Sequence, residues 1–108
     1  MKEFIQGLLR ESIDKFGEFA KTREKGASKI ANAAKEKGGY SLLTWHHFKV
    51  KLPYYKNASE GKFDLDAAKK EYMETYKKIS LDMGEVEFQR EVGRLEVLGE
   101  LILKHTKK

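Results

Sequence analysis

The sequence predicts an all-α protein, a single compact domain of four or five helices that spans residues 1–108. Apolar residues recur at helical spacing along several segments of the chain. Glycine and proline stand where helices would be expected to stop, at Gly38, Gly39 and Pro53. A chain of 108 residues is also long enough to bury one hydrophobic core but too short for two.

The N-terminal segment is predicted to form an amphipathic helix. Its main apolar positions follow the helical period: Ile5, Leu8, Leu9, Phe16 and Phe19. The pattern weakens over residues 21–39, where Gly26 interrupts it and Ile30 is the only large apolar residue. We therefore expect a short helix over residues 27–37, within a connector at residues 21–39 that is mobile or orders only against a partner.

The most distinctive stretch is YSLLTWHHFKVKLPYY, residues 40–55, which contains the only tryptophan and the only proline. Ser41 predicts a helix start, because its hydroxyl can accept from amides of the first turn. Pro53 predicts that this helix stops near Lys51 or Leu52, because proline supplies no amide to the next turn. Four residues share the face that is expected to pack inward: Leu42, Trp45, Phe48 and Leu52. A strand over residues 48–52 is the alternative, since apolar and charged residues alternate there.

The remaining segments predict a loop and two further helices. Residues 56–62 have loop composition, and Asp64 is a suitable N-cap for the helix that follows. That helix is expected to bury Leu65, Ala68, Tyr72, Tyr76 and Ile79. Asp82 and Glu85 predict a capping box that starts the last helix at Met83, and this helix is expected to run to about Lys104. We expect it to pack centrally against residues 40–52.

The last helix carries two further signals. Its expected core face consists of Phe88, Val92, Leu95, Leu98 and Ile102. Val97, Leu101 and Leu103 spread apolar surface beyond that face, which indicates either a central buried helix or a homodimer interface. Gly93 and Gly99 lower helix propensity, and this cost is most easily explained if another backbone lies close to them.

Charge is unevenly distributed along a chain whose net charge is +5. Residues 39–62 contain four lysines against one glutamate, whereas residues 83–103 contain five acidic residues against two arginines. A basic middle segment of this size is compatible with nucleic acid or an acidic protein and is specific to neither. The absence of cysteine excludes thiolate chemistry and suits the cytoplasm. No apolar run approaches the length that spans a membrane, so we expect no membrane partner.

The candidate binding surface, which we call the basic-aromatic rim, follows the tryptophan. It consists of His47, Lys49, Lys51, Tyr54, Tyr55, Lys56 and Lys62, all expected to be exposed. Lysines beside exposed aromatic rings suit a protein partner, and they also suit single-stranded nucleic acid, whose bases stack on such rings. The competing interpretation is that the two tyrosines fold back onto the core and the lysines only solvate the surface.

Catalytic and metal sites are not predicted. No base lies at a fixed spacing from a nucleophile, so we expect no enzyme activity and no cofactor. His46 and His47 are adjacent, and neighbours on a helix point about 100° apart, whereas helical metal ligands stand three or four residues apart. We expect His46 to be half-buried and His47 to be solvated. A histidine-based metal-binding protein is retained only as a further alternative.

Two short runs carry a resemblance to known proteins. Residues 43–49, LTWHHFK, followed by PYYK at residues 53–56, are similar to a segment in short helical proteins of unknown function from tailed bacteriophages and bacteria. The opening MKEFI, with LRE at residues 9–11, is similar to the start of many small tailed-phage proteins. The resemblance implies a phage-like accessory origin and assigns no residue a role. We expect a small interaction protein that binds a protein partner, with nucleic acid as the alternative partner.

Overall fold

The computed structural model describes residues 2–37, 41–80 and 82–106, with the backbone alone described at residues 2–14, 37 and 41. Over these residues the chain forms five helices: α1 (Lys2–Lys37), α2 (Ser41–Lys49), α3 (Leu52–Ser59), α4 (Leu65–Lys78) and α5 (Glu85–Thr106). The prediction of an all-α single domain with four or five helices is confirmed. The strand alternative for residues 48–52 is wrong, since no strand occurs in the described part of the chain.

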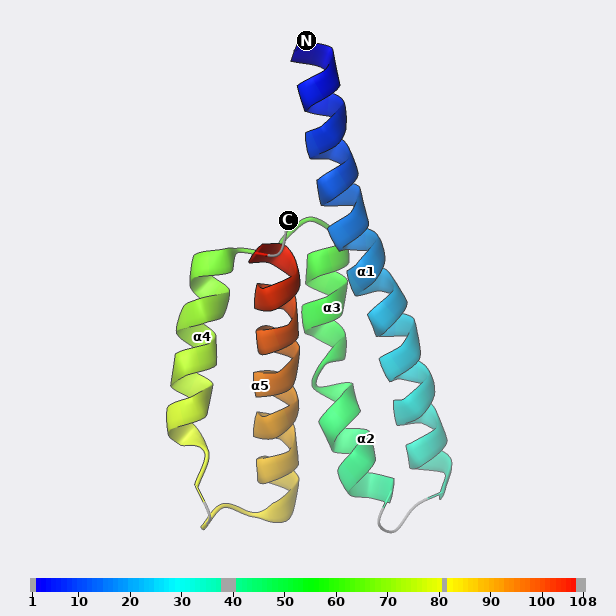
Figure 1. Ribbon diagram of the computed structural model, residues 1–108. Helices are drawn as coiled ribbons and strands as arrows, with labels where there is room; N and C mark the ends of the chain where they lie inside the picture. Colours follow the sequence, from blue (N-terminus) through cyan, green and yellow to red (C-terminus); the bar gives the residue numbers. More distant parts are fainter. Residues whose placement is uncertain (1, 38–40, 81, 107–108) are drawn as a thin grey trace.

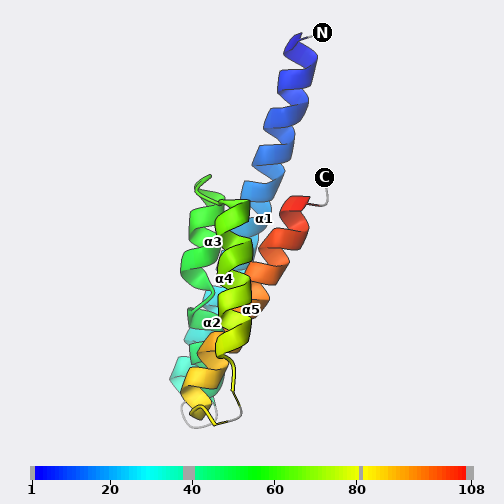
Figure 2. The ribbon, with the colours of Figure 1, turned by 90° about the vertical axis from the view of Figure 1, so that its left-hand side faces the viewer.

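The helices lie side by side in what is close to a single layer. Figure 1 shows α4 at one edge and α1 at the other, with α5 and the α2–α3 pair between them. The molecule measures 57 × 31 × 17 Å, and one helix with its side chains is about 10–12 Å thick. Helix α5 packs against α2 and α4, and α1 packs against α2 and α3. Figure 2, turned by 90°, shows the same thin arrangement.

Helix α1 is continuous, and Gly26 does not interrupt it. Its fully buried residues are alanines on one helical face: Ala20, Ala27, Ala31 and Ala34. Phe16 and Phe19, which are partly buried, also pack against the core. Ile30, the expected anchor, is 44% exposed. The prediction that residues 27–37 are helical is confirmed, whereas the predicted interruption at Gly26 is wrong. Alanines let the α1 backbone lie close to α2 and α3 in this part of the helix without a large side chain. The predicted glycine stop at Gly38 and Gly39 lies outside the described residues.

The N-terminal part of α1 extends beyond the rest of the molecule. At 1.5 Å per residue, the 36 residues of α1 span about 54 Å, whereas the 22 residues of α5 span about 33 Å. The two perpendicular views agree that the first turns of α1 rise past the ends of the other helices (Figures 1 and 2). We refer to residues 2–14 as the projecting segment.

The break between α2 and α3 falls earlier than predicted. Helix α2 ends at Lys49, and Pro53 occupies the first turn of α3 instead of terminating a helix. A proline fits the first turn of a helix, whereas its ring would clash with a helical carbonyl four residues earlier, here that of Lys49. Residues 56–59, predicted to be loop, consequently belong to α3.

The starts of α4 and α5 can be compared with the predicted starts. The predicted N-cap of α4 is confirmed, since Asp64 Oδ1 accepts from the amide of Ala67 at 3.2 Å. Helix α5 begins at Glu85, two residues later than the predicted start at Met83. Tyr76 was expected in the core but is 63% exposed, because the single layer leaves the outer face of α4 uncovered.

The core of α5 also differs from the predicted face. Its most deeply buried large side chains are Val97, Leu98 and Leu101, whereas Phe88 is 36% exposed. The predicted self-association surface is therefore wrong for Val97 and Leu101 and remains accessible only at Leu103, which is 60% exposed. The physical reason is that α5 has neighbours on two opposite sides, so residues outside the expected stripe are covered by α2, α3 and α1.

Helix α5 approaches the end of α2 closely at Gly93. A Cβ atom at Gly93 would overlap the carbonyl oxygen of His47 and would lie 2.8 Å from Cγ1 of Val50. The prediction that another backbone lies close to Gly93 is confirmed. At Gly99 the neighbour is a side chain instead, with Tyr72 Cε2 3.3 Å from the position of a Cβ atom.

Two glycine-to-alanine substitutions are expected to change stability in opposite directions. Gly93→Ala should lower the free energy of unfolding by about 1–3 kcal/mol, because its methyl group meets backbone that cannot yield cheaply. Gly26→Ala should raise it by about 1 kcal/mol, because nothing lies within 4 Å of the new methyl group and alanine favours the helix. Urea denaturation followed by circular dichroism measures both, and equal effects of the two substitutions would contradict the α2–α5 contact.

Candidate functional site

The structure turns part of the basic-aromatic rim inward. Tyr55 is only 3% exposed, and its hydroxyl donates to Glu100 Oε1 at 2.9 Å. Lys51 is 8% exposed. The expectation that Tyr55, Lys51 and His47 all lie open to solvent is therefore wrong. Because α3 continues the helical path after the break, it carries Tyr55 against α5 instead of leaving it in a loop.

Glu96 on α5 interacts with both His47 and Lys51. Its Oε2 lies 2.7 Å from His47 Nε2, and its Oε1 lies 3.7 Å from Lys51 Nζ. The Lys51 ammonium also lies 4.8 Å from the ring centroid of Phe48. The Nδ1 atom of His47 is buried and has no hydrogen-bond partner within the described residues. One carboxylate on α5 thus holds both basic groups beside the α2–α3 break.

Tyr54 links α3 to α4. Its hydroxyl donates to Glu71 Oε1, and its ring is partly buried. Burial, which has the larger effect, and the hydrogen bond to Glu71 raise the pKa of Tyr54 to about 12. Burial and the hydrogen bond to Glu100 likewise raise the pKa of Tyr55 above its ordinary value. Both tyrosines therefore act as fixed donors to carboxylates.

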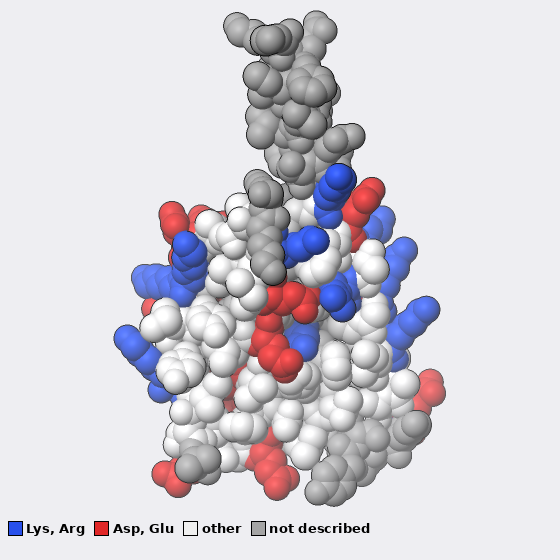
Figure 3. Space-filling view, viewed as in Figure 1, with Lys and Arg blue, Asp and Glu red and all other residues white. Residues whose placement is uncertain are grey.

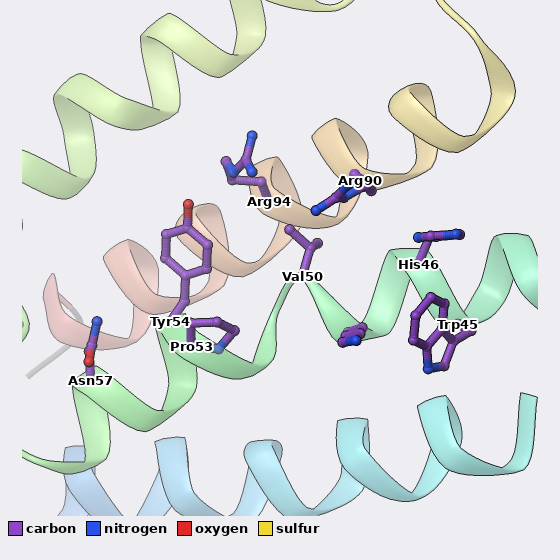
Figure 4. Close-up of a pocket in the computed structure, with 9 residues that line it drawn as sticks. Trp45, His46, Val50, Pro53, Tyr54, Asn57, Arg90 and Arg94 are labelled. Carbon is purple, nitrogen blue, oxygen red and sulfur yellow. The ribbon is translucent and has the colours of Figure 1, made fainter. Parts of the chain in front are cut away.

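Beside these contacts lies a hollow that we call the basic-aromatic groove. Its volume is about 730 Å³, and it is lined by Trp45, His46, Lys49, Val50, Pro53, Tyr54, Asn57, Arg90 and Arg94. Figure 4 shows that Trp45 and His46 come from α2, that Pro53, Tyr54 and Asn57 come from α3, and that both arginines come from α5. The groove therefore follows the line where α5 passes the α2–α3 break.

The cations of the groove are not all neutralised. Arg94 Nη1 lies 2.6 Å from Glu91 Oε1, so this guanidinium already has a carboxylate partner. Arg90 is exposed and forms no ion pair with any other described residue, and the same is true of Lys49. The groove consequently offers two positive groups to an incoming anion.

Trp45 provides an aromatic surface between cations. The ammonium of Lys49 lies 4.3 Å from the indole centroid, and that of Lys35 on α1 lies 5.8 Å from it. The ring of His46 meets the indole edge-on, with centroids 4.6 Å apart. Trp45 is partly exposed in this position, so a ligand can reach it.

The sequence-based site is thus only partly brought together. Lys49 and Tyr54 line the groove, whereas Lys56 and Lys62 are exposed outside it, and Lys62 Nζ lies 3.5 Å from Glu60 Oε2. Five lining side chains with polar or aromatic groups were not predicted as site residues: Trp45, His46, Asn57, Arg90 and Arg94. The spacing of the two arginines, four residues apart on one helix, was the available signal, but it stood in an acidic helix.

The two adjacent histidines do not converge on a common point. His46 contacts the indole of Trp45, and His47, expected to be solvated, contacts Glu96. Among the residues that the structure describes, no group of three or more His, Asp and Glu side chains is arranged to hold a metal ion. No helix in the described part of the chain is both long enough and apolar enough to cross a membrane.

Comparisons with protein-family models, with curated proteins and with solved structures find no match for this chain. The similarity of residues 43–49 and 53–56 to short phage proteins therefore stays a prediction.

The two buried tyrosine hydroxyls predict a loss of stability at high pH. The pKa of Tyr54 rises from 10.0 to about 12 on folding, so its contribution is complete below about pH 10 and is lost as pH rises through 12. Tyr55 acts in the same direction. Urea denaturation from about pH 8 to about pH 12 should show a shallower decline for the Tyr54→Phe/Tyr55→Phe variant than for the wild type. Parallel declines would contradict the two hydroxyl–carboxylate bonds.

Proposed function

We propose that this chain is a small, non-enzymatic interaction protein that binds a protein partner through the basic-aromatic groove. The observation that carries the proposal is the meeting of a partly exposed tryptophan with two cations, Lys49 and Arg90, that have no carboxylate partner among the described residues. The chemistry selects an acidic segment that also carries apolar side chains. We further propose that it acts in the cytoplasm as a phage-like accessory protein, in line with the sequence resemblance and the absence of cysteine.

The lining of the groove supports this choice of partner. Trp45, Val50 and Pro53 supply apolar surface, whereas Asn57 and Arg90 supply hydrogen-bond donors. Interfaces between proteins commonly centre on tryptophan and arginine residues that fill or border a pocket. A carboxylate flanked by an apolar side chain would satisfy an unpaired cation and cover the indole at the same time.

Single-stranded nucleic acid is the second candidate. The specific observation in its favour is Trp45 with the Lys49 ammonium over its ring, because bases stack on such rings while cations neutralise phosphates. Against it stands the limited positive charge, since Arg94 is paired with Glu91 and Lys62 with Glu60. A strand of several nucleotides would require a longer track of free cations than this groove provides.

Trp45 allows a direct test, because it is the only tryptophan in the chain and lines the groove. A synthetic peptide of alternating aspartate and leucine should change the Trp45 emission on titration. The Lys49→Glu/Arg90→Glu variant should bind this peptide at least about tenfold more weakly, because two attractive charges become repulsive. A peptide with asparagine in place of aspartate should bind as weakly to the wild type.

The matched control is Lys70→Glu/Lys77→Glu, which changes the net charge equally at two exposed positions on α4. It should retain most of the affinity. Equal losses in the two double variants would contradict binding in the groove, as would an unchanged Trp45 emission. A thymidine oligonucleotide that binds more tightly than the peptide, with affinity falling steeply as salt increases, would support the second candidate instead.

A further inference from the structure

The backbone of the projecting segment stands apart from the other helices that the structure describes. Residues 2–14 stand clear of the other helices in both perpendicular views (Figures 1 and 2). Their sequence nevertheless carries large apolar residues at helical spacing: Phe4, Ile5, Leu8, Leu9 and Ile13. An isolated helical segment of this length is marginal in water, and an apolar stripe on it stabilises the helix only when it is covered. The sequence of the segment therefore indicates a partner surface that the described part of its own chain does not supply.

An uncovered apolar surface lies between α4 and α5, and we call it the α4–α5 groove. It has a volume of about 430 Å³ and is lined by Lys69, Tyr72, Met73, Gly99, Ile102 and Leu103. Two of these side chains are largely open to solvent, Met73 at 52% and Leu103 at 60%. Figure 3 shows a broad uncharged area over α4 and α5 on the face of Figure 1. An exposed apolar surface of this kind marks an interaction site.

The projecting segment cannot reach the α4–α5 groove of its own molecule. Helices α1 and α4 form opposite edges of the layer, with α5 and the α2–α3 pair between them (Figure 1). Helix α1 is unbroken from Lys2 to Lys37, so the projecting segment continues along its axis instead of folding back across the layer. Only the segment of another molecule can reach the α4–α5 groove.

We propose that two copies of this chain form a reciprocal homodimer, in which the projecting segment of each copy lies in the α4–α5 groove of the other. A two-fold arrangement places both projecting segments and both α4–α5 grooves in contacts and leaves no segment or groove open for further growth. Charge supports the pairing, because residues 2–14 carry three carboxylates against two cations, whereas Lys69 stands at the edge of the groove. Leu103 is the one residue of the predicted self-association surface that takes part.

The test uses the full-length chain with one substitution on each surface. Leu9→Glu places a charge in the projecting segment, and Leu103→Glu places one in the α4–α5 groove at an exposed position. Sedimentation velocity, with concentrations up to the hundred-micromolar range, should show a wild-type dimer and at least about tenfold weaker dimerisation for each variant. Leu42→Glu, at a position 46% exposed on α2, is the matched control and should remain dimeric.

An equimolar mixture of the two variants provides the decisive result. The Leu103→Glu copy keeps an intact segment, and the Leu9→Glu copy keeps an intact groove, so one complete contact can form between them. We expect dimers to return in the mixture, which also shows that both variants are folded. A wild-type monomer, a Leu103→Glu variant that dimerises normally, or a mixture that stays monomeric would each overturn the proposal. None of these substitutions touches the basic-aromatic groove, so the two proposals can fail separately.

Discussion

The contact between Gly93 on α5 and the backbone of His47 on α2 sets the spacing of these two helices, on which the candidate site depends. A side chain at Gly93 would overlap the carbonyl oxygen of His47, so only glycine permits this spacing between the two helices. Glu96 lies one turn further along α5 and thereby reaches His47 and Lys51. Arg90 lies one turn earlier and thereby borders the basic-aromatic groove. The same close approach thus serves both the packing and the candidate site.

The thin layer has consequences for binding. With a thickness of 17 Å, the molecule has little interior, and most of its fully buried apolar residues are alanines of α1 and three residues of α5. Val97 and Leu101 are completely buried, whereas side chains such as Met73 and Leu103 stay exposed. A single layer therefore leaves hollows on its surface between neighbouring helices. The basic-aromatic groove and the α4–α5 groove are two such hollows, one polar and one apolar.

Local signals in the sequence were sufficient for the features that depend on neighbouring residues alone. The helical periodicity and the N-cap at Asp64 were predictable for this reason. The close approach at Gly93 is a contact between helices, and it was predictable because a glycine inside a helix lowers helix propensity and so indicates a packing role. The prediction that Pro53 ends a helix was wrong, because proline disfavours the helix before it and equally suits the first turn of the next one. Because Pro53 lies in the first turn of α3, Tyr55 belongs to that helix and is buried.

The candidate site was harder to predict because its residues come from three helices. Lys49 and Tyr54 were found from composition, but Arg90 belongs to an acidic helix and joins them only through the α2–α5 contact. Lys51 illustrates the opposite error: a lysine was expected at the surface, whereas Glu96 from another helix allows it to be buried. Long-range pairing of this kind leaves no trace in the local pattern.

Nuclear Overhauser spectroscopy tests the α2–α5 contact most directly. A Cβ atom at Gly93 would lie 2.8 Å from Cγ1 of Val50, so one Hα proton of Gly93 points at that methyl group from nearly the same position. The structure predicts a strong cross-peak between the Gly93 Hα protons and a Val50 methyl group. The absence of that cross-peak in the folded protein, with both resonances assigned, would contradict the arrangement on which the groove depends.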